Sequence, residues 1–270
     1  MHERLSVHTV GFGPMPARDF IGDLAEAGIT RVGMQVTQVE AGGVSANLAA
    51  ARAAGIEILD LVASDAAFTF ADESRWPSER DRFRVCVDVA VEAGASILYM
   101  TSGPARALTW DEAAARFTDA IAPIVEYAGT AGVSLAVENT NTMRADLGFV
   151  HGVRDVMDLA SMAGIAPCAD LCAGWTDRGL ESALREGASQ FAMVQVSDFV
   201  LGTMCSADRA VPGDGDIPIQ RHLSWLADAG YTGPIEMELL GPRITAEGPA
   251  AAGARAVRVM TELVEAAFAG

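Results

Sequence analysis

Short apolar segments recur along the chain, and most follow a helix-like segment that ends in a small residue and a glycine. Six such glycines are Gly28, Gly55, Gly94, Gly132, Gly164 and Gly230. Glycine suits the left-handed position just past a helix end. With the first run and the run after Gly187, the pattern gives eight apolar segments: 5–10, 30–36, 56–62, 96–101, 133–138, 165–170, 191–196 and 234–239. Nearly continuous apolar runs are typical of parallel strands buried on both faces.

Eight alternating strand and helix units within 270 residues predict an α/β fold, a single (β/α)8 TIM barrel. A doubly wound open sheet is the alternative. Its first turn would be HTVGFGPMP, which lacks the third glycine of a dinucleotide-binding loop and carries Pro14 and Pro16 at the helix start. No linker rich in proline or serine divides the chain, so we expect one barrel domain over residues 1–270.

The helical pattern is clearest in two segments, 80–94 and 111–130. The first places four apolar residues on one face: Phe83, Val87, Ala90 and Val91. The second has Asp111 at the expected cap position, after Trp110. Residues 197–216, between the seventh strand and its helix, form a long segment rich in Gly, Asp and Ser. Loops of that length in compact domains are usually functional or mobile.

Acidic or amide residues lie at the ends of four predicted strands. Glu138, Asp170 and Glu238 close the fifth, sixth and eighth runs, and Gln195 lies near the end of the seventh. In a barrel these strand ends meet at one mouth. Carboxylates crowded there partly protonate unless a cation compensates their charge. The pattern therefore predicts a divalent-metal site formed by these four residues, although any one alone could instead cap a helix or pair with arginine.

Composition narrows the chemistry. All 19 basic residues are arginine, which excludes a Schiff-base lysine, a pyridoxal phosphate anchor and a P-loop lysine. The net charge of −17 counts against a nucleic-acid partner. We see no membrane-length apolar stretch and no signal peptide, so we expect a cytoplasmic protein without membrane association. The cysteines lack metal-ligand spacing, and we expect reduced, buried thiols at Cys86, Cys168, Cys172 and Cys205.

Five segments, in this order and spacing, resemble the xylose isomerase-like TIM barrels: AVENTN, ADLCAGW, VQVSDF, VPGDGDIP and GYTGPIEMEL. This superfamily includes sugar phosphate isomerases and ketose epimerases, and the resemblance covers essentially the whole chain. It implies that Glu138 and Glu238 serve both as metal ligands and as an acid/base pair. It further implies that Asn141 and Arg209 contact substrate. By their positions near strand ends, Trp175 and His8 are also candidates for the substrate-binding mouth.

The chain departs from the family pattern at two histidines. The histidine ligand on the seventh strand is Gln195, with Asp198 retained, and the D-x-x-H pattern after the sixth strand ends in Ala173. The predicted ligand set therefore contains only oxygen donors, which favour Mg²⁺ or Mn²⁺ over Zn²⁺. A mouth without a metal is the alternative.

These observations predict a divalent-metal-dependent isomerase or epimerase acting on a sugar or other polyhydroxy carbonyl compound. One of Glu138 and Glu238 would remove a proton and the other would return it, through a metal-stabilised enediolate. A lyase (dehydratase or deglycosidase) on the same scaffold is the first alternative. A barrel that binds a small molecule without turnover is the second, and the two lost histidines motivate it. The expected partner is a small-molecule substrate, and the resemblance implies a homodimer.

Overall fold

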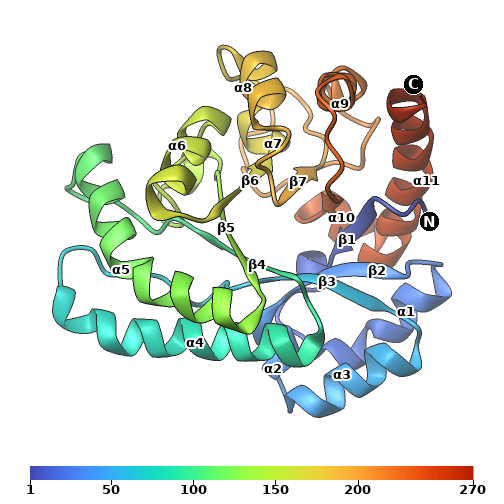
Figure 1. Cartoon of the computed structure of the whole chain (residues 1–270). Helices are drawn as coiled ribbons and strands as arrows, with labels where there is room; N and C mark the ends of the chain where they lie inside the picture. Colours follow the sequence, from blue (N-terminus) through green and yellow to red (C-terminus); the bar gives the residue numbers. More distant parts are fainter. Residues whose placement is uncertain (270) are drawn as a thin grey trace.

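The computed structural model describes residues 1–269, in which eight parallel strands close into a barrel with β1 paired to β8 (Figure 1). The strands are β1 Leu5–His8, β2 Arg31–Gln35, β3 Glu57–Val62, β4 Ile97–Thr101, β5 Ser134–Glu138, β6 Ala166–Asp170, β7 Met193–Val196 and β8 Ile235–Glu238. Each pairs in parallel with its neighbours. The predicted (β/α)8 barrel is confirmed.

Helices cover the outside of the barrel, where α4 lies beside α5 and α9 beside α11 (Figure 1). The α-helices are α1 Ile21–Glu26, α2 Val36–Glu40, α3 Val44–Ala53, α4 Trp76–Ala93, α5 Trp110–Ala131, α6 Val153–Ala163, α7 Leu171–Gly174, α8 Leu180–Gly187, α9 Ile219–Asp228, α10 Pro242–Glu247 and α11 Pro249–Phe268. Short 3-10 helices are η1 Thr9–Phe12, η2 Ala17–Asp19, η3 Glu73–Arg75 and η4 Thr142–Arg144.

The helix ends agree in part with the prediction. Gly94 and Gly132 follow α4 and α5 with φ of 74° and 76°, the left-handed conformation expected after a helix. The predicted N-cap residue of α5, Asp111, was wrong. Thr109 is the N-cap and forms a capping box with Glu112, so Asp111 lies inside the first turn.

The buried face of α4 also differs in one position. Phe83, Val87 and Ala90 are buried as predicted, whereas Val91 is 51% exposed. Cys86 is fully buried on this helix, one turn after Phe83. The apolar stripe of α4 is therefore rotated slightly from the one expected.

The barrel interior contains both apolar and polar side chains. One interior cluster is apolar and consists mainly of Val62, Ile97, Tyr99, Ala136, Cys168 and Met193. Buried polar side chains also come from the barrel strands, two of them from β3 and β7 of the apolar cluster, and include Ser6, His8, Asp60, Gln195 and Glu236. A buried polar group in a barrel core needs a partner or a function, so these polar side chains are candidates for the functional site.

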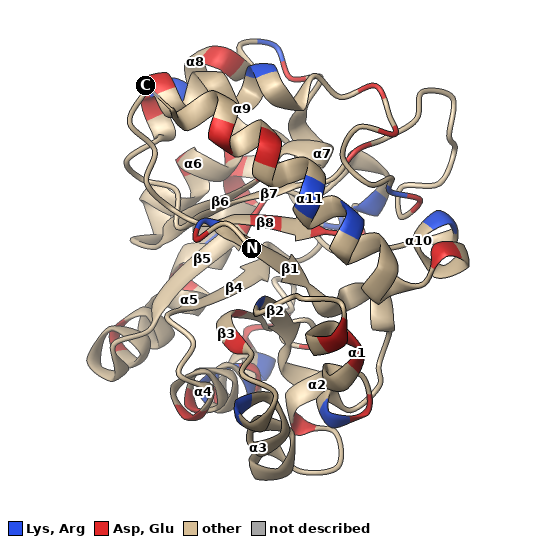
Figure 2. Cartoon of the chain, turned by 90° about the vertical axis from the view of Figure 1, so that its right-hand side faces the viewer, with Lys and Arg blue, Asp and Glu red and all other residues tan. Residues whose placement is uncertain are grey.

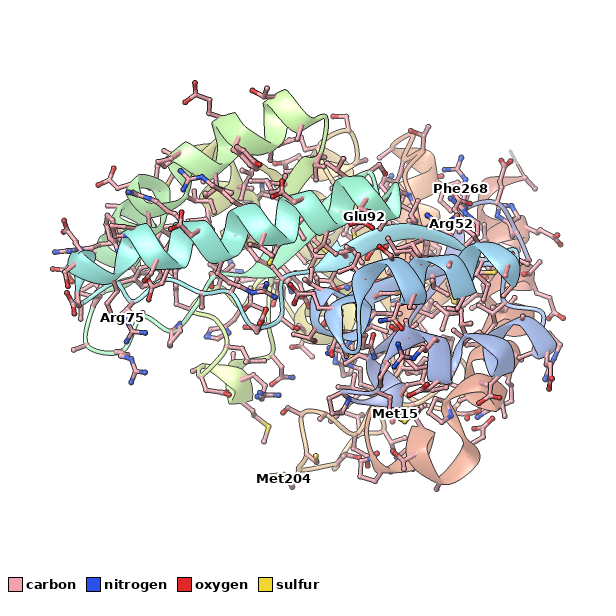
Figure 3. The ribbon with its side chains drawn as sticks, turned by 90° about the horizontal axis from the view of Figure 1, so that it is seen from below. Met15, Arg52, Arg75, Glu92, Met204 and Phe268 are labelled. Carbon is pink, nitrogen blue, oxygen red and sulfur yellow. The ribbon has the colours of Figure 1, made fainter. Side chains whose placement is uncertain are left out.

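The two ends of the barrel are distinct in Figure 3. Met15, Arg75 and Met204 belong to segments between a strand and the next long helix and lie toward one side, whereas Arg52, Glu92 and Phe268 lie near helix C-termini toward the other. Cys205 belongs to the loop after β7 and is exposed, so the prediction of four buried thiols holds only for the other three. Within residues 1–269, none of the helices is long and apolar enough to cross a membrane.

Candidate active site

Three carboxylates converge at the mouth of the barrel. Glu138, Asp170 and Glu238 are the last residues of β5, β6 and β8. One oxygen from each lies within 4.8 Å of the others. Asp170 is fully buried, Glu138 is buried and Glu238 is partly buried. Three strands with strictly parallel pairing bring together residues that are up to 100 positions apart, as the strand-end pattern predicted.

Arg209 lies within this acidic triad (Glu138, Asp170 and Glu238). Its Nη2 is 2.7 Å from Asp170 Oδ2 and 2.9 Å from Glu238 Oε2, and its Nη1 donates to Asp170 Oδ1 at 3.2 Å. Nη1 also donates to Ser197 Oγ at 3.0 Å. The guanidinium is a fixed positive charge that offsets part of the acidic triad. The protein itself thus supplies some of the compensating charge that the sequence assigned to a metal.

Burial and crowding perturb the ionisation of the triad. Burial, followed by the charges of Glu238 and Asp170, raises the pKa of Glu138 well above its ordinary value, although Arg209 opposes this. Burial also raises the pKa of Asp170, and here Arg209 is the main opposing influence. Burial disfavours the charged Arg209 guanidinium, but Asp170 and Glu238 outweigh it and raise the pKa of Arg209. The guanidinium therefore remains charged.

The mouth contains a cavity of about 300 Å³, which we call the mouth cavity. Glu138, Glu238 and Arg209 line it together with Tyr99 and His8. Its volume lies within the range of small-molecule sites. Figure 2 shows acidic residues, in red, on the central strands as well as on the outer helices.

The segment VPGDGDIP, residues 211–218, is hydrogen-bonded to Asp198 and so fixes the loop that carries Arg209. The Asp198 carboxylate, just after β7, accepts hydrogen bonds from the backbone N–H groups of Gly213, Gly215 and Ile217 at 2.9 to 3.0 Å. A side chain at position 215 would lie 2.3 Å from Asp198 Oδ1. Asp198 and Ala210 exchange backbone hydrogen bonds, which place the preceding residue, Arg209, over the triad. The motif is therefore structural, and its effect on the site runs through Arg209.

Gln195 is fully buried and is the register partner of Asp170 on the neighbouring strand. Its Nε2 donates to Glu236 Oε2 at 2.9 Å and to the Tyr99 hydroxyl at 3.1 Å. Its Oε1 is buried and has no partner among the described residues. A metal ligand would use this oxygen, and the role of Gln195 as a ligand stays a prediction. Its nitrogen, however, is held by a second acidic group that the sequence analysis did not identify.

That second group consists of Asp60 and Glu236, which come from the middle of β3 and β8. Both are fully buried. Burial raises the pKa of Asp60 to about 7, and it raises the pKa of Glu236 well above its ordinary value. Gly33 makes room for the pair, since a Cβ there would lie 1.9 Å from Glu236 Oε1 and 2.5 Å from Asp60 Oδ1. A signal was present in the sequence: charged residues interrupt the apolar runs EILDLV and IEME.

His8 lies beside this pair and borders the mouth cavity. Its Nδ1 accepts from the Val10 backbone N–H at 3.1 Å, and burial, with Arg209 nearby, lowers its pKa to about 3. A neutral ring whose Nδ1 is an acceptor carries its hydrogen on Nε2. His8 therefore presents a donor, not a lone pair, and it suits a hydrogen bond better than a metal.

The other two predicted contact residues lie on the side of β5 and β6. The Asn141 side chain accepts from the Met143 N–H and borders the mouth cavity and a neighbouring cavity. Trp175 borders the neighbouring cavity and does not line the mouth cavity. The predicted residues thus fall around two adjoining cavities instead of one.

The triad is suited to a divalent cation. Three carboxylates and one guanidinium leave two negative charges if all are ionised. Glu138 has no side-chain hydrogen bond within residues 1–269, and burial, followed by the charges of Glu238 and Asp170, raises its pKa. Such a set of carboxylate oxygens could hold a metal ion. A cation would share Asp170 and Glu238 with Arg209.

Solved structures with the same architecture align over nearly the whole chain. A protein from Sinorhizobium meliloti has a TM-score of 0.84 at 23% identity and is covered over 98% of both chains. IolI, solved with a zinc atom, has a TM-score of 0.82 at 15% identity, covering 99% of this chain and 100% of its own. The 3-keto-D-glucoside 4-epimerase of E. coli has a TM-score of 0.78 at 14% identity, covering 97% and 100%. These likenesses establish the fold alone.

No curated protein sequence matches the chain. The profile of the family described as xylose isomerase-like TIM barrel matches residues 21–262. This match spans seven of the eight strands and both the PGDGD loop and the acidic triad. The protein therefore belongs to the xylose isomerase-like TIM barrel family.

Proposed function

We propose that the protein is a divalent-metal-dependent isomerase or epimerase of a sugar or related polyhydroxy carbonyl compound. The observation that carries the proposal is the convergence of Glu138, Asp170 and Glu238 within 4.8 Å at a mouth of ligand size. Family membership supports it, as does the fold shared with a 3-keto-D-glucoside 4-epimerase and with zinc-bound IolI.

The chemistry is a proton transfer at a carbon next to a carbonyl group. Glu138 and Glu238 both line the mouth cavity, so a bound substrate meets both carboxylates. One removes the proton and the other returns it, a transfer that typically contributes about 10²–10⁴-fold to the rate. A divalent cation held by the triad would supply a Lewis acid for the carbonyl oxygen.

Arg209 and Tyr99 support the carboxylates of the mouth cavity. Arg209 keeps Asp170 and Glu238 together through its two salt bridges. The Tyr99 hydroxyl accepts from Gln195 Nε2, so its own hydrogen is free to be donated at the cavity floor. Burial, with the surrounding carboxylates, raises the pKa of Tyr99 well above its ordinary value, which keeps that hydrogen in place.

The test is exchange of solvent deuterium into carbonyl sugars, with Mn²⁺ or Mg²⁺ present, using ketoses and 3-keto-glucosides. Glu138→Gln and Glu238→Gln should each lower the exchange rate by about 10²–10⁴-fold. Glu126→Gln, at an exposed position on α5, is the matched control and should retain it.

Metal analysis of protein purified without chelators accompanies this test. A protein that binds no metal and exchanges no sugar proton would refute the proposal and favour binding without turnover. Product analysis distinguishes the lyase alternative, because loss of water or of an aglycone differs in mass from an isomeric product.

A further inference from the structure

A second cavity, of about 410 Å³, opens beside the triad on the side of β5 and β6. Its wall comes from the segments that follow these strands, including residues of α6 and α8, and Phe199, after β7, also lines it. Cys172 and Ala173, in the first turn after Asp170, border it. Asn141 borders both cavities. The two cavities therefore adjoin at Asn141.

The lining of the second cavity carries no net charge. Two arginines, Arg154 and Arg178, are matched by two aspartates, Asp155 and Asp177. Arg154 is also paired with Glu186 at 2.8 Å. A phosphate or carboxylate group would need an excess of positive charge or a cluster of donors. The balance of charge therefore favours an uncharged occupant.

Aromatic and apolar side chains form the rest of the wall. Trp175 and Phe199 are half-buried and line the cavity. Ala173 is the smallest side chain a chiral residue can place beside Asp170, and it leaves the cavity open there. Flat aromatic side chains bind rings through their faces, and they provide apolar area with few rotatable bonds.

Hydrogen bonds to the backbone orient two polar side chains that line the second cavity, His151 and Asp177. His151 Nδ1 lies 2.9 Å from the Thr140 carbonyl oxygen, which can only accept, so Nδ1 carries the hydrogen. The lone pair of His151 Nε2 is left for a ligand hydroxyl at the cavity wall. Asp177 Oδ2 accepts from the Val153 N–H at 2.8 Å, which ties the α7–α8 loop to the start of α6. The cavity therefore has two fixed walls instead of a mobile surface.

We propose that the second cavity binds an uncharged ring attached to the reacting sugar, so that the preferred substrate is a glycoside and not a free monosaccharide. The inference rests on the proposed function of the triad. The reacting sugar occupies the mouth cavity, and its aglycone or second sugar ring lies against Trp175 and Phe199. Both kinds of ring share a flat apolar face and a polar edge.

The experiment measures binding to the Mn²⁺-loaded protein by calorimetry. The probes are methyl β-D-glucoside, p-nitrophenyl β-D-glucoside and the disaccharide cellobiose. Of the two probes with a second ring, p-nitrophenyl β-D-glucoside and cellobiose, at least one should bind about tenfold more tightly than the methyl glucoside. This is the effect expected of one well-placed ring contact. The aryl probe and the disaccharide distinguish an aromatic aglycone from a second sugar.

Two variants test whether the tighter binding arises from contacts in the second cavity. Ala173→Phe fills the second cavity and Trp175→Ala removes its aromatic wall, and each should bring the binding ratio close to one. Ala49→Phe, at an exposed position on α3, is the control and should keep the ratio. Circular dichroism confirms that each variant is folded, and Trp175→Ala, which creates no overlap, keeps the test valid if Ala173→Phe fails to fold.

The outcomes separate this inference from the proposed function. Equal binding of all three probes, or a gain that survives both cavity variants, overturns the inference and leaves the proton-transfer chemistry untouched. Absence of binding by every probe, together with no deuterium exchange into any carbonyl sugar, overturns both.

Discussion

Arg209 donates to both oxygens of Asp170, at 2.7 and 3.2 Å. The guanidinium of the protein itself therefore supplies a positive charge in direct contact with the acidic triad. Replacing it by methionine would leave a buried carboxylate without its partner. Breaking a buried pair in this way typically costs about 3–5 kcal/mol. We expect Arg209→Met to lower the thermal midpoint substantially, and Mn²⁺ to restore part of the loss, because a divalent cation can replace the missing charge.

Calorimetric melting with and without Mn²⁺ measures this. Arg243→Met is the matched control, because Arg243 pairs with Asp208 at the surface and its side chain is 48% exposed. Its removal should cost no more than about 1 kcal/mol. An Arg209→Met protein as stable as the parent, or one indifferent to Mn²⁺, would show that the guanidinium does not balance the triad.

The Asp60–Glu236 pair predicts a stability that falls as pH rises. Burial raises the pKa of Asp60 to about 7, whereas an unfolded aspartate titrates near about 3.9. The folded state therefore holds this proton more tightly than the unfolded chain does. The contribution of protonated Asp60 to the free energy of unfolding is fully present below the pKa of the unfolded chain. It is lost as pH rises through the folded pKa of about 7.

Urea unfolding between about pH 4 and pH 8 tests this, with the slope compared between variants. Asp60→Asn should flatten the fall, because an amide does not titrate. Asp119→Asn, at an exposed position on α5, should leave the slope as it is in the parent. A parent protein and an Asp60→Asn protein with the same pH dependence would contradict the prediction.

Gly33 should not tolerate a methyl group. A Cβ at this position overlaps Glu236 Oε1 at 1.9 Å, and overpacking of a core typically costs about 1–3 kcal/mol. Gly22→Ala is the control: no atom lies within 4 Å of its Cβ, and it is within α1. Alanine there should stabilise slightly, since it is the better helix former. Equal unfolding free energies for the two variants would refute the close approach.

The Asp198 carboxylate should govern how firmly the loop at 197–216 is held. Asp198→Ala removes the acceptor of the backbone N–H groups of Phe199, Gly213, Gly215 and Ile217. A cost of about 3 kcal/mol is expected for losing such charged hydrogen bonds. Amide hydrogen exchange should accelerate at residues 213–217, and KM should rise because Arg209 loses its support.

Asp214→Asn provides the comparison within the same loop. Asp214 pairs with Arg255 at 2.7 Å and is partly exposed, so its replacement should leave exchange at Gly213 and Gly215 slow. Unchanged exchange in Asp198→Ala would mean that the PGDGD segment is held by contacts other than this carboxylate.

The fold could be predicted because its signal is local and repeated. Most apolar runs follow a helix-like segment that ends in a small residue and a glycine, and parallel closure brings strand-end carboxylates to one mouth. The capping error at α5 was avoidable, since Thr109 and Glu112 have the spacing of a capping box. Propensity at single residues therefore failed where a two-residue motif would have succeeded.

The remaining features depend on partners far apart in sequence. Arg209 reaches Asp170 only because a long loop folds back on Asp198, and no local pattern encodes that return. Gln195 meets Tyr99 from β4 and Glu236 from β8, contacts that the register of a closed barrel sets. The Asp60–Glu236 pair was visible as charge within apolar runs, but the tolerance of the core for it depends on Gly33.

The exposure of Cys205 has a practical consequence. Its thiol is accessible, whereas Cys86, Cys168 and Cys172 are buried. Maleimide dyes or nitroxide spin labels would therefore attach at one position in the native chain, without prior mutagenesis. The next two residues, Ser206 and Ala207, border the mouth cavity. A probe on Cys205 would lie at the rim of the mouth cavity and would report ligand binding there in real time.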